Sequence, residues 1–336
     1  MAAVSAESRK SGKAPIPART ATVTTTARLH FGFLDPSGRG PHPFGSFGLS
    51  LDRPVTRLTL TKADALSVTG PESERAERLL RRIAASFRFP KGYALHVETA
   101  IPPHAGLGSG TQLALAVGSA FAALAGVRLD PQDVASRLGR GARSGIGIAT
   151  FSFGGVVLDS GPQPDGLPQL VSRLPFPPDW RVLLIFDSEL SGLAGPGETA
   201  AFDTLPDFPQ RETDALSRRV TLSALPALAA QDFATFCEEI GALQAAMGAY
   251  FAPLQGGPYA SPRVGAALDW LRRDGVTGLG QSSWGPTGFA FVASQAEGLS
   301  LLGRLRAAFQ QPGLSFELAQ GRNEGAKIET SAGEIQ

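Results

Sequence analysis

Residues 101–112 read IPPHAGLGSGTQ, a glycine-rich turn between a predicted strand and an apolar helical segment. Gly106, Gly108 and Gly110 alternate along this turn, which permits positive φ angles and lets main-chain N–H groups converge where the helix begins. Such a helix start binds anions, phosphate among them. The turn lacks the Lys-Ser/Thr ending of a P-loop, and its third glycine comes too early for a dinucleotide-binding turn. It therefore predicts phosphate binding, with a structural turn that holds no ligand as the alternative.

Several side chains of the turn extend this prediction. Ser109 and Thr111 carry hydroxyls that suit phosphate oxygens or a Mg²⁺ ion, and both are predicted metal ligands. His104 could donate a hydrogen bond to the phosphate, or it could simply fill its position. The predicted phosphate-binding residues of the turn are His104, Gly106, Leu107, Gly108, Ser109, Gly110 and Thr111.

Composition and charge argue against several classes of function. The 336 residues are 43% hydrophobic and 18% charged, with a formal net charge of +1. These values are ordinary for a soluble globular protein and leave no strong field for nucleic acid or an anionic membrane. No apolar run reaches the roughly 20 residues of a membrane-spanning helix. Cys237 is the only cysteine, so no intramolecular disulfide can form, and a cytoplasmic location is expected.

The first half of the chain has strand and helix signals in blocks. Residues 22–35 and 49–61 have strand character around a loop at 36–48, residues 72–88 show helical spacing with a charged face, and residues 93–100 alternate as a half-buried strand. The glycine turn and its helix follow. Asp130 and Pro131 then predict the start of a further helix.

The second half predicts a separate unit. A proline-dense stretch at 161–180 marks the boundary, and a buried strand follows it. Helices are expected between about 211 and 251, a strand–turn–strand at 275–294, a helix near 295–310 and a final strand. We predict a two-domain α+β protein with a mobile tail at 1–20, an N-terminal domain at 21–170 and a C-terminal domain at 171–336.

Three stretches together are more specific than the glycine turn alone. They are TARLHFGFLD at 26–35, PPHAGLGSGTQ at 102–112 and GLGQSSWGPTGF at 278–289. With them the chain resembles the GHMP superfamily over about residues 22–330. The resemblance implies a two-domain GHMP-kinase-like fold in which the central motif wraps phosphates and the last motif shapes the site from the second domain.

One segment argues against phosphoryl transfer. In SGIGIATFSFGG, residues 144–155, Gly147 stands where mevalonate-kinase-like members carry an aspartate. A glycine can neither accept a proton nor orient a hydroxyl, so a central part of that chemistry is missing. Arg28 also replaces the lysine of many such kinases. Because homoserine kinases work without that aspartate pattern, a small-molecule kinase that uses ATP stays as the alternative.

Six stretches resemble more closely the β-ribofuranosylaminobenzene 5′-phosphate synthases, a family with this fold: ARLHFGFLD, FGSFGLSLDRP, GLGSGTQLALAVG, GARSGIGIATFSFGG, YFAPLQGGPYASP and GQSSWGPTGF. The resemblance implies a decarboxylating pentosyltransferase of methanopterin biosynthesis, which joins phosphoribosyl pyrophosphate and 4-aminobenzoate and releases CO₂ and pyrophosphate. The glycine turn would then hold a departing pyrophosphate, helped by Mg²⁺ and arginines. A homodimer is also implied. A regulator that kept the pocket without the chemistry is a further alternative.

The strand before the first loop carries the predicted catalytic residues, which are Arg28, His30 and Asp35. Arg28 and His30 lie two residues apart, hence on one face of a strand, and could contact the sugar phosphate or the aromatic acid. An exposed pair on an edge strand is the alternative. Asp35 is predicted as an acid, a base or a Mg²⁺ carboxylate, with capping of a turn as the alternative.

Other candidates lie in glycine-rich loops. Arg39 and Arg143 could bind phosphate or carboxylate bidentately, or lie exposed to solvent. Trp284 could stack on the aromatic ring or wedge the two domains together. The predicted substrate contacts outside the glycine turn are Arg39, Arg143, Gln281, Ser282, Ser283 and Trp284.

Overall fold

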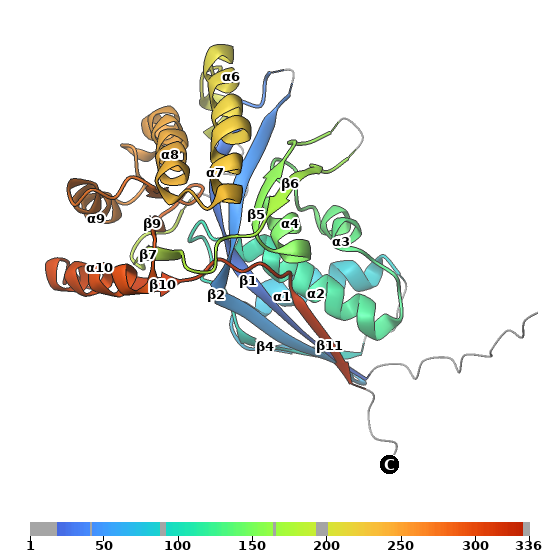
Figure 1. The fold of residues 1–336 in the computed structure, drawn as a ribbon. Helices are drawn as coiled ribbons and strands as arrows, with labels where there is room; N and C mark the ends of the chain where they lie inside the picture. The colour runs from blue at the N-terminus through green and yellow to red at the C-terminus, as the bar shows by residue number, and fades with distance from the viewer. Residues whose placement is uncertain (1–18, 41, 88–91, 164–165, 193–200, 332–336) are drawn as a thin grey trace, which may run out of the picture.

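The computed structural model describes residues 19–40, 42–87, 92–163, 166–192 and 201–331. The predicted tail at 1–20 lies outside the described residues as far as residue 18. Two sheets with their helices make up the fold (Figure 1). Among the described helices, none combines the length and the apolar character needed to traverse a lipid bilayer.

A seven-stranded sheet forms around two long antiparallel strands, β1 and β2. Their β-branched and aromatic residues favour extended backbone, as the strand prediction for residues 22–35 and 49–61 required. The strand order is β11-β1-β2-β4-β3, and β5 pairs with both β2 and β6. The strands are β1 (Thr20–Asp35), β2 (Phe44–Lys62), β3 (Ser67–Thr69), β4 (Tyr93–Thr99), β5 (Val156–Asp159), β6 (Leu170–Leu174) and β11 (Lys327–Ser331).

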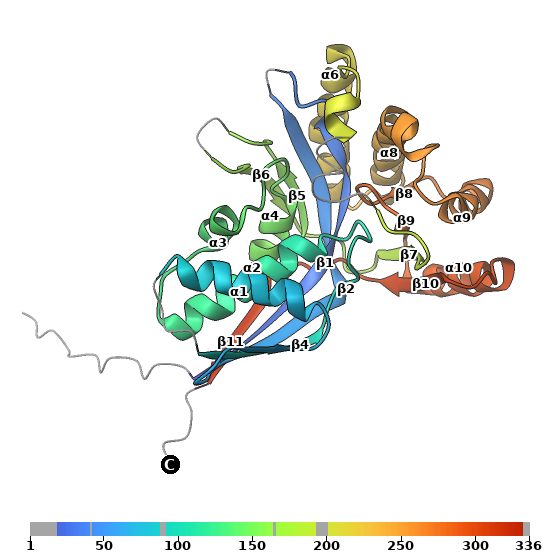
Figure 2. The same cartoon turned by 180° about the vertical axis from the view of Figure 1, so that it is seen from behind.

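Four helices gather on one side of this sheet (Figures 1 and 2). They are α1 (Ser73–Ala85), α2 (Ser109–Ala125), α3 (Pro131–Leu138) and α4 (Ile146–Phe153). Helix α2 is apolar nearly all round, as a fully buried helix is, and it contacts β1, β2 and the other three helices. Asp130 caps α3 in a capping box with Pro131 in the first turn, which confirms the predicted start. The glycine turn therefore leads into the centre of this layer.

The second sheet is antiparallel in the order β10-β7-β9-β8. Alternation along β7 divides two cores, since Leu183 and Ile185 pack toward α9 and α10 while Val182 and Leu184 pack toward α8 and β1. The strands are β7 (Arg181–Asp187), β8 (Leu279–Gln281), β9 (Gly288–Val292) and β10 (Leu314–Ala319). The helices are α6 (Gln210–Arg219), the π-helical turn η1 (Val220–Ala224), α7 (Leu225–Ala230), α8 (Phe233–Gln255), α9 (Pro262–Arg273) and α10 (Gln295–Ala308).

One aromatic core joins the two halves of the chain. Phe31 of β1 packs against Phe47 of β2 and against Phe289 and Phe291 of β9, with ring centroids 5.4, 5.6 and 5.7 Å away. The chain also crosses the predicted division at 170/171, because β6 and the late strand β11 both pair in the first sheet. The contact between the halves places β1 beside the turn that links β8 and β9.

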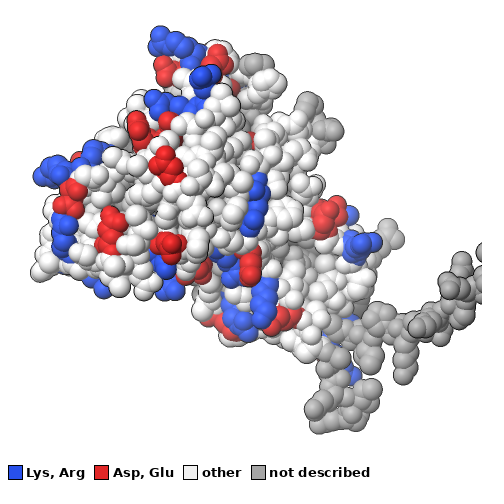
Figure 3. Space-filling view, in the orientation of Figure 1, with Lys and Arg blue, Asp and Glu red and all other residues white. Residues whose placement is uncertain are grey.

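Some elements depart from the sequence prediction. Strand β2 begins at Phe44, inside the predicted loop at 36–48, because its pairing with Asp35 continues the ladder. Helices α4 and α9 have no counterpart in the prediction. The charged side chains, in contrast, agree with the near-neutral balance: on the face in Figure 3, acidic and basic residues are interspersed.

Candidate active site

The glycine turn has the geometry of an anion-binding helix start. Gly106 and Gly108 adopt φ angles of 76° and 80°, a region that favours glycine. Helix α2 begins at Ser109, and no side chain caps its first turn within the described part of the chain. The Thr111 and Gln112 N–H groups donate to the Gly108 carbonyl, each at 3.0 Å, which leaves the N–H groups of Ser109 and Gly110 for a ligand at the positive end of the helix dipole.

Hydrogen bonds tie the three sequence motifs together at this turn. The Ser282 hydroxyl donates to the Gly106 carbonyl oxygen at 2.7 Å and accepts from the His30 main-chain N–H at 3.0 Å. The Ser283 N–H donates back to the His30 carbonyl at 3.1 Å. Ser282 is therefore a structural bridge between the first strand and the glycine turn.

Arg28 lies along the same turn. Its main-chain N–H donates to the Leu107 carbonyl at 3.1 Å, and its guanidinium donates to the Gly106 carbonyl. A Cβ built on Gly108 would lie 3.0 Å from Arg28 Cγ, so the arginine stem is packed against the loop. β11 pairs with β1 only from Thr20 to Thr24, so at Arg28 and His30 the side of β1 away from β2 is covered by main-chain hydrogen bonds with Leu107 and Ser283 instead. The charge of Arg28 thus stands beside the first turn of α2.

A cavity of about 30 Å³ lies between β1, α8 and the turn after β8. Four predicted residues line it: His30, Gln281, Ser283 and Trp284. The volume is that of roughly one water-sized group. Trp284 packs beside it against Phe251, with ring centroids 4.5 Å apart. The cavity joins residues that lie about 250 positions apart in the sequence.

His30 is the only titratable residue among those that line the cavity. The side chain is buried, and Nε2 has no hydrogen-bond partner within the described structure. Burial, followed by the nearby charge of Arg28, holds the pKa of His30 well below its usual range. The imidazole is therefore neutral, and Nε2 is free to contact a polar group that enters the cavity.

Acid should destabilise the fold through His30. The unfolded chain takes up a proton at His30 near pH 6.5 and the folded chain resists it, so stability is present above that pH and lost below it. We expect the difference in free energy of unfolding between wild type and His30→Gln to fall by about 1.4 kcal/mol per pH unit below 6.5. Urea titrations at pH 7.5, 6 and 5 measure this difference. Parallel pH curves for the two proteins would contradict the assignment.

The segment around Gly147 packs directly against the first turn of α2. The Gly147 carbonyl accepts from Gln112 Nε2 at 2.8 Å, and a Cβ on Gly147 would lie 2.9 Å from Thr111 Cγ2. Asp159 anchors this segment from β5, because its carboxylate accepts from the Gly145 N–H at 2.7 Å. Burial raises the pKa of Asp159 to about 6. Sequence reasoning did not single out Asp159, which has no motif signal.

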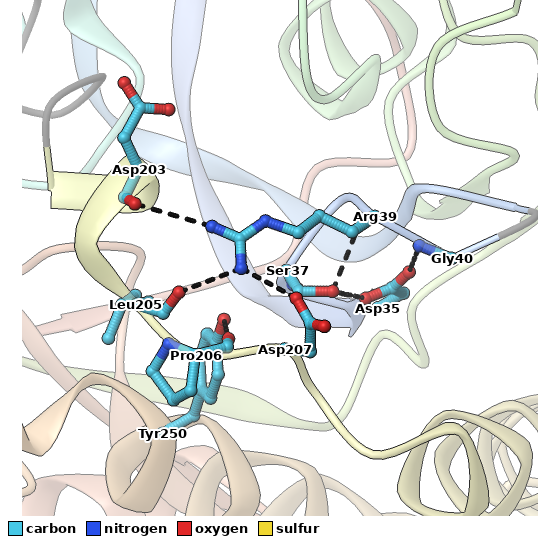
Figure 4. A network of polar contacts seen from close by, with 9 residues as sticks. All are labelled: Asp35, Ser37, Arg39, Gly40, Asp203, Leu205, Pro206, Asp207 and Tyr250. Atoms are coloured by element: carbon cyan, nitrogen blue, oxygen red, sulfur yellow. Dashed lines mark hydrogen bonds and ion pairs between the residues drawn. The ribbon is translucent and has the colours of Figure 1, made fainter.

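Two predicted residues have contacts that belong to a different loop (Figure 4). Asp35 accepts hydrogen bonds from the Ser37 hydroxyl at 2.6 Å and from the Gly40 N–H at 3.0 Å, which is the turn-capping alternative. Arg39 pairs with Asp207 at 2.7 Å, and this partner raises the arginine pKa. Within the described residues, no hydrogen bond or ion pair joins Asp35 or Arg39 to the glycine turn.

The remaining predicted residues lie around the turn and the cavity. The Arg143 guanidinium lies 4.7 Å from the Phe202 ring centroid, and Phe202 packs on Trp284 at 5.4 Å. The carbonyl of His104 accepts from the Gly192 N–H at 2.8 Å. This hydrogen bond therefore fixes the main chain at the point where it enters the glycine turn.

Sequence reasoning missed two cations at the turn. Arg75 of α1 and Arg140, two residues after α3, both reach the position where Gly110 would carry a Cβ. Arg75 belongs to the charged helix face that the sequence marked as polar, and no local pattern indicates where that face packs. The first turn of α2 is thus flanked by arginines on two sides.

The donor set limits how a metal ion could bind. In the described part of the chain, no group of three or more His, Cys, Asp or Glu side chains is placed to hold one. Ser109 and Thr111 offer neutral hydroxyls beside arginines. Such a set suits Mg²⁺ only when phosphate oxygens supply the charged ligands.

Family models match both halves of the chain. The model described as GHMP kinases N terminal domain matches residues 74–155, and the one described as GHMP kinases C terminal matches residues 224–311. The first match spans the glycine turn and the segment around Gly147. The second spans α8 and the turn after β8.

Two archaeal proteins are similar to this chain over nearly their whole length. The beta-ribofuranosylphenol 5′-phosphate synthase of Methanothermobacter thermautotrophicus is 27% identical over 331 residues, which cover 90% of this chain and 97% of that protein. The synthase of the same name from Archaeoglobus fulgidus is 28% identical over 326 residues, covering 91% and 98%.

Solved structures share the fold at lower identity. Homoserine kinase from Cytophaga hutchinsonii superimposes with a TM-score of 0.63 at 16% identity, covering 96% of this chain and 100% of that one. Mevalonate diphosphate decarboxylase from Staphylococcus aureus gives 0.64 at 16%, covering 93% and 98%. With the family models, these confirm the predicted two-domain α+β fold of the GHMP type.

Proposed function

Since this chain belongs to the GHMP kinase superfamily and is related to its ribofuranosylphenol phosphate synthases, we propose that it is a decarboxylating phosphoribosyltransferase of methanopterin biosynthesis. The donor is phosphoribosyl pyrophosphate, and the acceptor is 4-aminobenzoate. The products are β-ribofuranosylaminobenzene 5′-phosphate, CO₂ and pyrophosphate. The observation that carries the proposal is the cavity with a neutral His30 beside an uncapped, arginine-flanked helix start.

The departing pyrophosphate binds at the first turn of α2. The C1′–O bond of the donor breaks, and its electron pair leaves with the pyrophosphate. Main-chain N–H groups and Arg28 stabilise this growing charge more strongly in the transition state than in the bound donor. The hydroxyls of Ser109 and Thr111 would help to hold a Mg²⁺ ion bound to the donor's phosphates, and that ion would neutralise part of the charge on the departing pyrophosphate.

The acceptor ring lies at the mouth of the cavity, against Trp284. Its ring carbon that bears the carboxylate attacks C1′, and the bond to that carboxylate then breaks, which releases CO₂ and restores aromaticity. The substituent para to this carbon supplies electron density. An amino group is about the size of a water molecule, so it fits the cavity of about 30 Å³ and reaches Nε2 of His30.

Labelled acceptor tests the reaction directly. The protein is incubated with phosphoribosyl pyrophosphate, Mg²⁺ and carboxyl-labelled 4-aminobenzoate, and both labelled CO₂ and pyrophosphate are measured. Equal amounts of the two are expected. Because the relatives' name describes a ribosylated phenol, 4-hydroxybenzoate is tested in a parallel reaction. If labelled CO₂ comes only from 4-hydroxybenzoate, that acid is the acceptor in place of 4-aminobenzoate. If neither acid releases CO₂, the proposed function is wrong.

A GHMP-type kinase is the second candidate, and Gly147 supplies its test. We expect Gly147→Asp to show no phosphoryl transfer from ATP, because the new side chain would press on Thr111 at 2.9 Å and one carboxylate cannot rebuild an acceptor site. Release of ADP in the presence of homoserine and other small alcohols measures this activity.

Ser109→Ala is the companion variant and should lower ribosyl transfer by about tenfold. Kinase activity in Gly147→Asp would favour the second candidate.

A homodimer is the proposed assembly, on the family resemblance alone. Light scattering of the purified chain tests it, and a monomer mass would exclude it.

A further inference from the structure

Two arginines reach the start of α2 near Gly110, and a third lies close to the residue before one of them. Nη2 of Arg75 and Nη1 of Arg140 both lie within 4 Å of the position that a Cβ on Gly110 would take. Nη2 of Arg82 lies 3.5 Å from the Cβ position of Gly139, the residue before Arg140. We call Arg75, Arg82 and Arg140 the arginine cluster.

Arg75 and Arg140 of the cluster lie beside the N-terminus of α2, the unfavourable end of a helix for cations. Positive side chains stabilise a helix C-terminus and destabilise an N-terminus, because the helix dipole is positive there. The first turn of α2 carries no acidic residue that would offset them. Across the described ranges, Glu72 is the one carboxylate that forms an ion pair with the cluster, 3.5 Å from Arg75. Three guanidinium groups thus face one carboxylate.

Arg140 shows the strain of this arrangement most clearly. Its Nε is buried and has no hydrogen-bond partner within the described structure. Burial, then the charges of Arg75 and Arg82, lower the pKa of Arg140. A buried donor without an acceptor and a group of like charges are both costly, and an anion would relieve both at once. The partner that would satisfy Arg140 is therefore an oxyanion, the group that guanidinium binds.

We propose that Arg75 and Arg140 form a subsite for a phosphate monoester, which in the proposed reaction is the 5′-phosphate of the donor. Arg28 lies against Gly108 and Arg75 against Gly110, two residues further along. The Cα atoms of such residues are at most about 7 Å apart, so one small molecule spans both flanks. The diphosphate end lies beside Arg28 and the cavity, where C1′ meets the acceptor. The monoester end lies at the arginine cluster.

This inference rests on the proposed function for the identity of the monoester, and two probes separate its ends. Ribose 5-phosphate probes the cluster, and inorganic pyrophosphate probes the glycine turn. Titration calorimetry on the full chain should show at least tenfold weaker binding of ribose 5-phosphate to Arg140→Gln and to Arg75→Gln. Pyrophosphate affinity should change less than threefold. Arg78→Gln is the control, since Arg78 lies on the same helix with a side chain 71% exposed.

Turnover separates failure of the subsite from failure of the function. In Arg140→Gln the KM for phosphoribosyl pyrophosphate should rise about tenfold, with a smaller change in kcat. If the wild type turns over while both variants keep their ribose 5-phosphate affinity and KM, the subsite is wrong and the function stands. If no labelled CO₂ appears but both variants lose ribose 5-phosphate, the subsite stands and the function falls. Loss of ATP binding with ribose 5-phosphate unaffected would overturn the assignment to the donor.

Discussion

Gly106→Ala is expected to lower kcat/KM by at least a hundredfold. The residue adopts a φ of 76°, and a Cβ there would press on the Ser282 carbonyl and lie 2.9 Å from the Gly285 carbonyl. Neither main-chain oxygen can rotate away, so the turn has to shift by a few tenths of an ångström or more. Because the N–H groups of the first turn act only when aligned with the leaving group, a small displacement is costly. Steady-state kinetics with labelled 4-aminobenzoate measure the loss.

Gly126 provides a matched control at the other end of the same helix. It adopts a φ of 67°, close to that of Gly106, but nothing lies within 4 Å of its Cβ position. Gly126→Ala should therefore cost about 1 kcal/mol of stability and leave turnover intact. If Gly106→Ala keeps the turnover of Gly126→Ala, the contact of the new Cβ with the Ser282 carbonyl does not displace the turn, and the prediction is wrong.

Arg28→Met is expected to lower kcat by a factor of about 10² to 10³, the range for removing one preorganised donor to a developing charge. The variant keeps the stem that packs on Gly108 and removes the charge and the hydrogen bond to the Gly106 carbonyl. Since the charge on pyrophosphate grows as the bond breaks, kcat should fall more than KM rises. Stopped assays that quantify released pyrophosphate provide both constants.

Two further variants separate charge from loop support. Arg28→Lys keeps a positive charge and should recover part of the lost kcat, while its bidentate geometry is gone. Arg57→Met removes an exposed arginine of the neighbouring strand, which pairs with Glu98, and should leave kcat unchanged. If Arg28→Met retains kcat within about fivefold, Arg28 only supports the loop and does not stabilise the leaving group.

Local patterns predicted the backbone geometry of the glycine turn and of the strand that packs on it. The alternating glycines and the following apolar run indicated a helix start with free N–H groups, and the structure has Gly108 at that cap. Spacing of two residues placed Arg28 and His30 on one side of β1. Both expectations depend on backbone rules that act within a few residues.

The parts that could not be predicted depend on packing over long distances. The charged face of α1 gave no sign that Arg75 turns toward α2, because that placement comes from the packing of α1 on α2, which the local pattern does not encode. The burial of His30 follows from the bridge through Ser282, more than 250 residues later. Asp35 illustrates the reverse case, since the short-range capping alternative accounts for all its observed hydrogen bonds.

The pairing of β11 with β1 affects the order in which the first sheet can form during synthesis. Thr20 pairs with Ser331, so the strand that carries Arg28 and His30 has one neighbour made early and another made last. During synthesis, the outer edge of that strand from Thr20 to Thr24 stays open until β11 has been made. An early strand of the sheet therefore depends on a strand about 300 residues later for its second neighbour.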